Sequence, residues 1–392
     1  MFPLEGITIV SLEQAVAAPF ATRQLAELGA RVIKVERPEV GDFARYYDST
    51  VSGMSSHFVW CNRSKQSVTL NLKKLEAKEV LHTLLSKADV FIQNLAPGAV
   101  DRLGFSTASL KEKYPELIIC HISGYGSYGP YRDKKAYDLL IQCESGLVSI
   151  TGTEEAPAKS GISIADIAAG MYAYTGILSA LLERNKTGKG TVLEISMLEA
   201  LGEWMGFPLY YSSNSDAELK RTGANHAAIY PYGPFATGDD KLVFLGIQNE
   251  REWKRFCETV LQQPQLASDS RFNENSKRVE HSDLLKQIID VVFQKLSASE
   301  LIDLLEQAQI ANARLNTMKE FFDHPQLHAR DRWRDVDSPV GKVRALIPPV
   351  TVEGVEPILN PIPDVGEHTD DILAEYGFTK ETIEGWKREG VL

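Results

Sequence analysis

The sequence is poor in cysteine: Cys61, Cys120, Cys143 and Cys257 are the only four in 392 residues, and no two form a C-x-x-C pair. A zinc knuckle or a redox dithiol would need such a pair, so neither is predicted. Cys120 and Cys143 stand in apolar runs and are expected to be buried small hydrophobic residues. Separate, reduced thiols suit a cytoplasmic protein, which is the expected location.

The sequence also lacks the histidine spacing of a metal site. His324 and His328 are four residues apart, but Pro325 stands between them and no third ligand is close. No metal is therefore predicted. No G-x-S-x-G elbow and no P-loop occurs, so a hydrolase or NTPase has no support.

Basic residues are fewer than acidic ones, 42 against 53, which gives a net charge of −11. Nucleic acids and anionic membranes bind basic faces, so neither is predicted as a partner. The apolar start Met1–Leu25 has no basic residues at its beginning and contains Glu5 and Glu13, unlike a signal peptide. The stretch Ile164–Leu182 has nearly the length of a membrane span. It is rich in alanine and glycine, which favours a buried core helix.

Short apolar runs alternate with helical patterns in the first third of the chain. Helices are expected at Phe20–Leu28 and Leu75–Lys87, and strands at Ile7–Leu12, Arg31–Val35, Val68–Leu72, Asp89–Gln93 and Leu117–Ile122. This alternation predicts βαβ units, a mostly parallel sheet and an α/β fold class. Ligands of such sheets bind beyond the carboxyl ends of the strands, here in the loops opened by Glu13, Glu36, Asn94 and Ser123.

The remaining chain is expected to divide into a large and a small domain. Residues 1–211 would form the large domain, with helices at Ala136–Ser149, Ile164–Arg184 and Leu198–Tyr211 and a strand at Val192–Ile195. The polar stretch 212–226 is expected to be a linker. Residues 227–327 would form the small domain, with a strand at Leu242–Gly246 and three helices. Residues 328–392 are proline-rich at first and are expected to be extended, ending in two short helices.

The segment Gly124–Gly129 fits the dinucleotide pattern G-x-G-x-x-G. That pattern binds a pyrophosphate when its last glycine enters a helix, whereas Pro130 follows here at once. No second strand ending in an acidic residue follows about 20 residues later, as ribose binding would require. A glycine turn is favoured, and a nicotinamide-dependent dehydrogenase stays open as a competitor.

Ser163 and Asp166 open the expected core helix with the spacing S-x-x-D, which is typical of a capping box. The same position suits a nucleophile, because backbone N–H groups and the helix dipole stabilise a carboxylate anion in a first turn. Apolar neighbours such as Ile164 and Ile167 would leave that anion poorly hydrated and reactive. The N–H groups near the helix start are also candidate oxyanion donors. Both interpretations of Asp166 stay open.

Basic residues occur in the loops expected at the strand ends, namely Arg37, Lys73, Arg102, Arg132, Lys134 and Lys135. Surface charge is the ordinary explanation. In a parallel sheet, however, several of them would converge on one edge, where a phosphorylated ligand binds.

Several blocks, in the right order over nearly the whole chain, resemble the family III CoA-transferases. They are Pro3–Val10, Leu28–Pro38, Cys61–Lys73, Gln93–Phe105, Ala165–Met171 and Lys186–Gly190. Formyl-CoA and carnitine CoA-transferases belong to this family, and the α-methylacyl-CoA racemases share its fold. The resemblance implies a Rossmann-like large domain completed by residues 328–392, a smaller α+β domain, and a homodimer of two interlocked rings.

The resemblance also implies site residues. It places the catalytic aspartate of the family on Asp166, with CoA and acyl-CoA as substrates and no permanently bound cofactor. The positions that contact CoA are, in this sequence, Val16, Ala17, Arg37, Leu70, Asn71, Leu72, Lys73, Asn94, Leu95, Ala96, Arg102, Lys135, Ala136 and Tyr137. The second carboxyl group of a dicarboxylic acceptor would need a cation, for which Arg45, Arg221 and His226 are candidates.

Departures from the family pattern narrow the expected activity. Formyl-CoA transferases carry a run of glycines where this sequence has Arg221–Tyr232, which disfavours formate and oxalate. The racemases need a histidine and a glutamate as proton shuttles. Tyr137 and Asn249 stand in their places, and neither suits that role. The phrases Ser11–Phe20, Lys134–Gln142 and Ile229–Phe235 resemble the mesaconyl-, itaconyl- and succinyl-CoA transferases, which act on C4–C5 dicarboxylates.

The sequence thus predicts a CoA-transferase that moves CoA from an acyl-CoA, expected to be succinyl-CoA, to a small dicarboxylic acid such as itaconate or mesaconate. The expected route passes through a mixed anhydride and then a CoA thioester of Asp166. A racemase-like isomerase, an intramolecular CoA transfer within a dicarboxylyl-CoA, and a non-catalytic acyl-CoA-binding protein stay open as alternatives.

Overall fold

The computed structural model describes residues 2–214 and 218–392 and divides into two compact units. The first unit consists of Met1–Leu147, Ser160–Phe207 and Ala329–Leu392, and the second of Val148–Lys159 and Pro208–His328. The segment 148–159, expected in the large domain, therefore belongs to the second unit. Of the expected linker 212–226, residues 215–217 lie outside the described residues.

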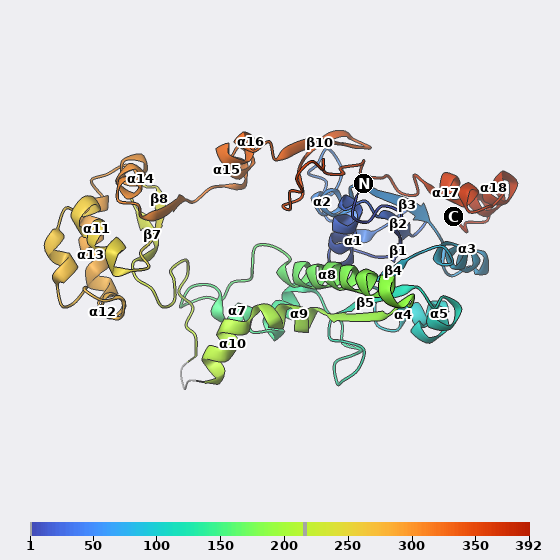
Figure 1. Cartoon of the computed structure of the whole chain (residues 1–392), viewed down its shortest axis with the longest axis horizontal. Helices are drawn as coiled ribbons and strands as arrows, with labels where there is room; N and C mark the ends of the chain where they lie inside the picture. Colours follow the sequence, from blue (N-terminus) through green and yellow to red (C-terminus); the bar gives the residue numbers. More distant parts are fainter. Residues whose placement is uncertain (1, 215–217) are drawn as a thin grey trace. The chain divides into compact units, whose positions relative to one another are not determined.

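A six-stranded parallel sheet forms the centre of the first unit (Figure 1). In spatial order its strands are β3 (Lys65–Thr69), β2 (Arg31–Glu36), β1 (Thr8–Leu12), β4 (Val90–Gln93), β5 (Ile118–Ser123) and β6 (Val192–Ser196). In the central strand, Ile9 pairs with Val32 on one side and Val90 on the other. The predicted α/β class with a parallel sheet is confirmed. The order reverses at β1, and such a switch point is where ligands bind.

Helices cover both faces of this sheet, which is why its inner strands are apolar along nearly their whole length. Ile9 packs in a cluster with α1 and α8, whereas the next residue, Val10, packs in a second cluster with α3, α17 and α18. The helices of this unit are α1 (Ala17–Glu27), η1 (Phe43–Tyr46), α2 (Ser56–Asn62), α3 (Leu75–Leu85), α4 (Ala99–Leu103), α5 (Thr107–Lys113), α6 (Asp138–Glu144), α8 (Ile164–Thr187), α9 (Met197–Trp204), α17 (Thr369–Glu375) and α18 (Lys380–Arg388).

Helix α8 crosses α1 at very short range (Figure 1). A Cβ atom on Gly170 would lie 2.7 Å from the carbonyl oxygen of Ala17 and 3.0 Å from the ring of Phe20, so only glycine fits there. Asp166 lies four residues earlier and thus on the same face of α8. Among the described helices α8 alone is long and apolar enough to cross a membrane, by length and composition. Its alanine-rich face is buried in the core of this unit.

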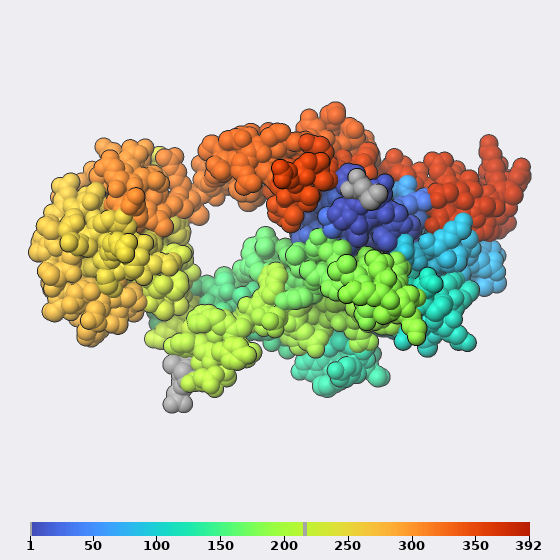
Figure 2. Space-filling model, in the orientation of Figure 1, coloured from blue at the N-terminus to red at the C-terminus, as the bar shows by residue number. Residues whose placement is uncertain are grey.

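The segment after the second unit completes the first one. A hairpin of β10 (Trp333–Ser338) and β11 (Gly341–Leu346) comes first, followed by α17 and α18. His368 and Thr369 hydrogen-bond to Ser67 and Thr69 of the edge strand β3, which covers an edge that would otherwise be open. Figure 2 shows the red segment with α17 and α18 beside the light-blue segment with α3.

The second unit has its own core around a three-stranded antiparallel sheet. Trp253, Phe256 and Phe293 are fully buried in that core. The elements with most of their length in this part of the chain are α7 (Leu147–Ile150), α10 (Gly206–Ser213), β7 (Tyr232–Ala236), β8 (Leu242–Gly246), α11 (Glu250–Arg255), η2 (Phe256–Val260), η3 (Pro264–Ser268), α12 (Asn275–Glu280), α13 (Ser282–Phe293), α14 (Ala298–Gln307), β9 (Ala311–Arg314), α15 (Met318–Phe322) and α16 (Pro325–Ala329).

Several expected elements differ from the structure. The single helix expected over 136–149 is two helices, α6 and α7, because Gly146 lies between them with a φ of 82°. The helix expected over 198–211 is likewise divided into α9 and α10. Strand β3 begins at Lys65, three residues before the expected strand. Cys120 is buried as expected, but Cys143 is exposed, because the neighbouring residues Ile141 and Gln142 form the buried face of α6.

Candidate active site

Asp166 lies in the first turn of α8, half-buried. The capping box suggested by Ser163 and Asp166 does not form, because the cap residue Ser163 makes no capping hydrogen bond through its side chain. Asp138, at the start of α6, caps the helix instead. Its Oδ1 accepts hydrogen bonds from the backbone N–H of Ala165 at 2.8 Å and of Asp166 at 3.3 Å. A carboxylate from another helix therefore satisfies the start of α8.

Asp138 is itself held in place by a buried amide. The side-chain nitrogen of Gln142 donates to Asp138 Oδ2 at 2.7 Å, and its oxygen accepts from the backbone N–H of Ser160 at 2.9 Å. Gln142 is fully buried. Neither residue was predicted to belong to the site, although an acid and an amide four residues apart on one helix are a recognisable signal of such a pair.

The burial of Asp166 and the negative charge of Asp138 both change the pKa of Asp166 in the same direction. Burial, and secondarily the charge of Asp138, raise the pKa of Asp166 to about 7. The sequence predicted an anion stabilised by the helix N-terminus. That prediction is wrong because Asp138 takes the N–H groups that would have stabilised Asp166, and the N–H of Ile167 donates to the Ser163 carbonyl. The same N–H groups are engaged, so their expected role as oxyanion donors has no support either.

The charge of Asp166 also affects the pKa of a tyrosine, Tyr47. Its pKa rises to about 12, through burial and through the charges of Asp42, Asp166 and Tyr137. At neutral pH its hydroxyl is therefore protonated and able to donate a hydrogen bond to an oxyanion.

The turn between β1 and α1 is fixed from two sides. Ala15 has a φ of 62°, and its N–H donates to Asp42 Oδ1 at 3.1 Å. Gln14 and Asn94 form a reciprocal pair, in which the N–H of Gln14 donates to Asn94 Oδ1 and Asn94 Nδ2 donates to the Gln14 carbonyl, both at 2.8 Å. These contacts fix the backbone immediately before Val16 and Ala17. Because Gly170 packs on Ala17, Asp166 is brought toward this turn.

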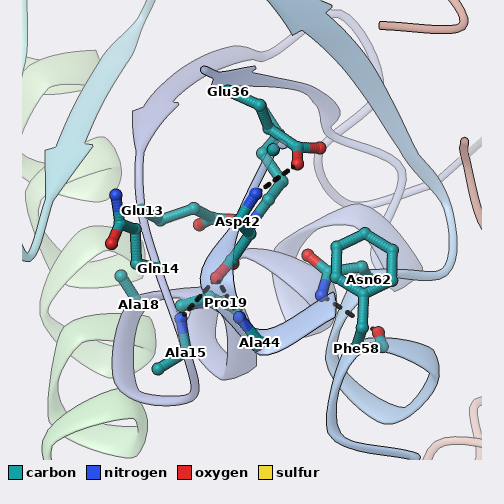
Figure 3. A network of polar contacts seen from close by, with 12 residues as sticks. Glu13, Gln14, Ala15, Ala18, Pro19, Glu36, Asp42, Ala44, Phe58 and Asn62 are labelled. Atoms are coloured by element: carbon teal, nitrogen blue, oxygen red, sulfur yellow. Dashed lines mark hydrogen bonds and ion pairs between the residues drawn. The ribbon is translucent and has the colours of Figure 1, made fainter. Parts of the chain in front are cut away.

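A buried ionic network includes Asp42, which Figure 3 shows accepting the hydrogen bond from the Ala15 N–H. The Nζ atom of Lys34 lies 2.7 Å from Asp42 and 3.4 Å from Glu13, and Lys65 donates to Glu13 at 2.7 Å. All four of these side chains are buried. Burial lowers the pKa of Lys65 to about 8 against the opposing effect of Glu13. Since an unpaired charge in such a site is costly, the pairing fixes Asp42 under Ala15.

A cavity of about 570 Å³ opens at the carboxyl ends of β1, β2 and β3. Its lining includes six positions expected to contact CoA: Arg37, Leu70, Asn71, Leu72, Lys73 and Leu95. The residues on its far side were not predicted, namely Lys387, Gly390 and Leu392. The cavity thus combines the strand ends expected from the sequence with a segment more than 300 residues away.

The other expected CoA positions lie near this cavity or on neighbouring loops. Val16 and Ala17 are buried at the start of α1, and Asn94 joins the β1–α1 turn as described. Ala96 lines a second cavity of about 310 Å³ beyond β4 and β5. Arg102 on α4 donates to the Pro97 carbonyl at 3.3 Å.

The remaining three positions, Lys135, Ala136 and Tyr137, precede α6 directly. A side chain on Gly124 would collide with Ala136, so this glycine allows the two loops to approach each other. The glycine segment ends in turns, and the next helix begins only at Asp138. It therefore lacks the helix that a dinucleotide site requires. Among residues 2–214 and 218–392, no group of three or more His, Cys, Asp or Glu is placed to hold a metal ion.

The three candidate cations for an acceptor carboxylate have different surroundings. Arg45 is partly buried, pairs with Glu36 through two hydrogen bonds of 2.8 and 2.9 Å, and stacks 3.7 Å from the Phe58 ring centroid. Contrary to the prediction, its guanidinium is committed to Glu36. Arg221 donates to the carbonyls of Ser149, Thr153 and Glu154.

His226 is the third candidate. Its ring stacks on Tyr232 with centroids 5.0 Å apart, and its Nδ1 accepts from the backbone N–H of Ala228 at 3.1 Å. In the neutral ring the proton is therefore on Nε2, which makes that atom a donor.

The matching family model and the curated relatives described here are all CoA-transferases. The family model of CoA-transferase family III matches residues 4–369. A human succinyl-CoA:glutarate CoA-transferase is 33% identical over 377 residues, which cover 95% of this chain and 86% of the relative. An acetyl-CoA:oxalate CoA-transferase from Acetobacter aceti is 34% identical over 331 residues, covering 84% and 85%.

The fold is also found among solved structures. A CaiB/BaiF family protein from Brucella suis superimposes with a TM-score of 0.85 and 32% identity, covering 96% of this chain and 99% of that one.

Proposed function

Because the chain belongs to CoA-transferase family III, we propose that it moves CoA from succinyl-CoA to a C4–C5 dicarboxylic acid, with Asp166 as the nucleophile. That the protein is a CoA-transferase follows from the family match and from the curated relatives. Glutarate and oxalate are named for those relatives, which supports a dicarboxylate substrate. The choice of itaconate or mesaconate as acceptor is the finer part of the proposal.

The observation that carries the proposed mechanism is the half-buried carboxylate at the start of α8, close to the β1–α1 turn. In the first step an Asp166 oxygen attacks the thioester carbonyl carbon of the donor, and the C–S bond breaks. A mixed anhydride and CoA thiolate result. The thiolate then attacks the Asp166 carbonyl carbon, which releases the donor acid and leaves a CoA thioester on Asp166.

The acceptor acid then takes the donor's place and the steps run backward. Its carboxylate attacks the Asp166 thioester, which expels CoA thiolate and forms a second anhydride. The thiolate attacks the acceptor's carbonyl carbon, so the new acyl-CoA leaves and the Asp166 carboxylate is restored. The reacting acyl group is held as a thioester or an anhydride at every step, so no ATP is consumed. An anhydride hydrolyses readily in water, and the apolar surroundings of Asp166 help to exclude it.

Two features of the site support this chemistry. With its pKa raised to about 7, the ionised Asp166 carboxylate is a more basic nucleophile than that of an ordinary aspartate. The protonated Tyr47 hydroxyl is the proposed donor for the oxyanion that forms at either carbonyl.

The direct test is Asp166→Ala. Transfer of CoA from succinyl-CoA to a labelled dicarboxylic acid should be lost, while the dissociation constant for CoA stays within about twofold of the wild type. Hydroxylamine should trap a hydroxamate at Asp166 in the wild type only when acyl-CoA is present. Asp133→Ala, an exposed aspartate on a loop of the same unit, is the matched control and should retain activity. Undiminished transfer by Asp166→Ala would refute the mechanism.

A substrate panel resolves the finer question and the alternatives. Succinyl-CoA is combined with itaconate, mesaconate, citramalate, glutarate and oxalate, and the products are identified by mass spectrometry. Preference for a C4–C5 acid supports the proposal, whereas preference for oxalate contradicts it. Mesaconyl-CoA labelled at one carboxyl carbon, incubated without an acceptor, detects intramolecular transfer. Loss of deuterium from the α-carbon of a 2-methylacyl-CoA would indicate a racemase instead.

We also propose that the protein is an interlocked homodimer in the cytoplasm, as the resemblance and the separate cysteines suggest. Size-exclusion chromatography with light scattering would give about 87 kDa for a dimer of a 43.5 kDa chain, and a single-chain mass would contradict this part of the proposal.

A further inference from the structure

We propose that Lys387, on α18, is a phosphate ligand for the nucleotide end of CoA and acts together with Arg37 and Lys73. This inference rests on the proposed function, because it takes the 570 Å³ cavity to be the CoA site. The three cations come from the β2 end, the β3–α3 loop and α18, and all three line that cavity. No residue of α18 was expected to contact CoA.

The position of Lys387 relative to Lys73 is fixed by hydrogen bonds between their two segments. The backbone N–H of Asn71 donates to the Val391 carbonyl at 2.7 Å, and its side chain donates to the Gly390 carbonyl at 3.1 Å. Lys74 donates to the Glu389 carbonyl. The turn that follows α18 is thus joined to the β3–α3 loop by three hydrogen bonds, one of them between backbone groups. Lys387 therefore belongs to the wall of the cavity.

The charges around the cavity favour an anion. Its two buried glutamates, Glu13 and Glu36, are paired with Lys65 and Arg45, and Asp42 is paired with Lys34. Among the lining residues that the structure describes, Arg37, Lys73 and Lys387 are exposed cations, and Glu39 has an exposed side-chain carboxylate. A phosphate placed among three lysine and arginine side chains gains charge-assisted hydrogen bonds.

Lys387 already has a partner that a phosphate would have to replace. Its Nζ lies 2.6 Å from Asp370 on α17, and both side chains are about half exposed. An ion pair so exposed is weak and is readily exchanged for a phosphate of higher charge. Asp370 should therefore reduce the affinity for CoA, since it competes for Lys387. Replacing Asp370 should therefore raise the affinity for CoA, whereas replacing Lys387 should lower it.

The experiment measures dissociation constants of CoA and of 3′-dephospho-CoA by titration calorimetry on the full chain. Lys387→Ala should weaken CoA binding by about 3- to 10-fold. Asp370→Asn should strengthen it by about 2- to 3-fold, and that gain should vanish in the double variant. Arg388→Ala is the matched control, since this neighbouring cation does not line the cavity, and should change binding by less than about twofold. Thermal unfolding of each variant checks that the fold is intact.

The two CoA analogues distinguish which phosphate is bound. A loss confined to CoA identifies the 3′-phosphate, and an equal loss with 3′-dephospho-CoA identifies the pyrophosphate; both support the inference. Lys387→Ala that binds CoA as tightly as Arg388→Ala would overturn it. A wild-type chain that binds CoA but transfers none would refute the proposed function alone, and one that binds no CoA would refute both.

Discussion

Replacing Asp138 with Asn should shift the pH dependence of the reaction without removing the nucleophile. Asn keeps the oxygen that accepts from the N–H groups of Ala165 and Asp166, so the cap of α8 persists. It removes the negative charge that, after burial, is the second cause of the raised pKa of Asp166. Its amide would face the donating nitrogen of Gln142, which costs about 1 kcal/mol of stability.

The magnitude follows from the two causes. Together they raise the pKa of Asp166 from 3.8 to about 7, and burial is the larger of the two. Loss of the Asp138 charge should therefore lower the pKa by less than half of that rise, to about 6, which corresponds to about 1.4 kcal/mol. At pH 6 the ionised fraction of Asp166 would increase from about one tenth to about one half, so the reaction would be about fivefold faster.

The assay is kcat/KM for succinyl-CoA between pH 5.5 and 9, since this quantity reports the ionisation of the free enzyme. Wild-type activity should rise with pH through about 7, because the carboxylate form attacks, and Asp138→Asn should show the same rise at lower pH. Above pH 8 the variant should be equal or slower, because a less basic carboxylate is a weaker nucleophile. Asp133→Asn should reproduce the wild-type profile. Superimposable profiles for Asp138→Asn and the wild type would refute the electrostatic reasoning.

Two further predictions concern stability, measured by urea unfolding. Gly170→Ala should destabilise the protein by about 1–3 kcal/mol and reduce kcat, because its Cβ would press on the Ala17 carbonyl at the α1–α8 crossing. Gly176→Ala on the same helix meets only an ordinary contact at 3.5 Å and should stabilise by about 0.5–1 kcal/mol; equal effects would contradict the packing argument. Arg45→Ala should cost about 3–5 kcal/mol by leaving Glu36 buried and unpaired, with KM for the dicarboxylate unchanged. A raised KM at unchanged stability would restore Arg45 as a substrate ligand.

The parallel sheet could be predicted because its signals are local. Five of its strands, β1, β2, β4, β5 and β6, were predicted with bounds within one residue at each end. Strand β3 was misplaced because it begins with Lys65 and contains Ser67, both buried. A lysine in a core is stable only with its partner, and that partner, Glu13, lies 52 residues away. No window of neighbouring residues contains this information.

The candidate site was predictable to a similar extent. Asp166 and the strand-end cations were found from spacing and from the resemblance, since both concern contiguous residues. The cap supplied by Asp138, the commitment of Arg45 to Glu36 and the place of Lys387 in the cavity wall depend on contacts between distant segments. Those contacts determine which polar groups are still free to bind a ligand, so the sequence overestimated some candidates and missed others.

The return of the chain to its first unit has a consequence for biosynthesis. On the ribosome, β1 through β6 are made first, the larger part of the second unit (Pro208–His328) follows, and α17 and α18 emerge last. Until then the nascent β3 lacks the hydrogen bonds from His368 and Thr369, and one wall of the 570 Å³ cavity does not exist. The nascent chain should therefore be a client for chaperones that shield exposed strand edges, and ligand binding should be gained only in the final moments of translation.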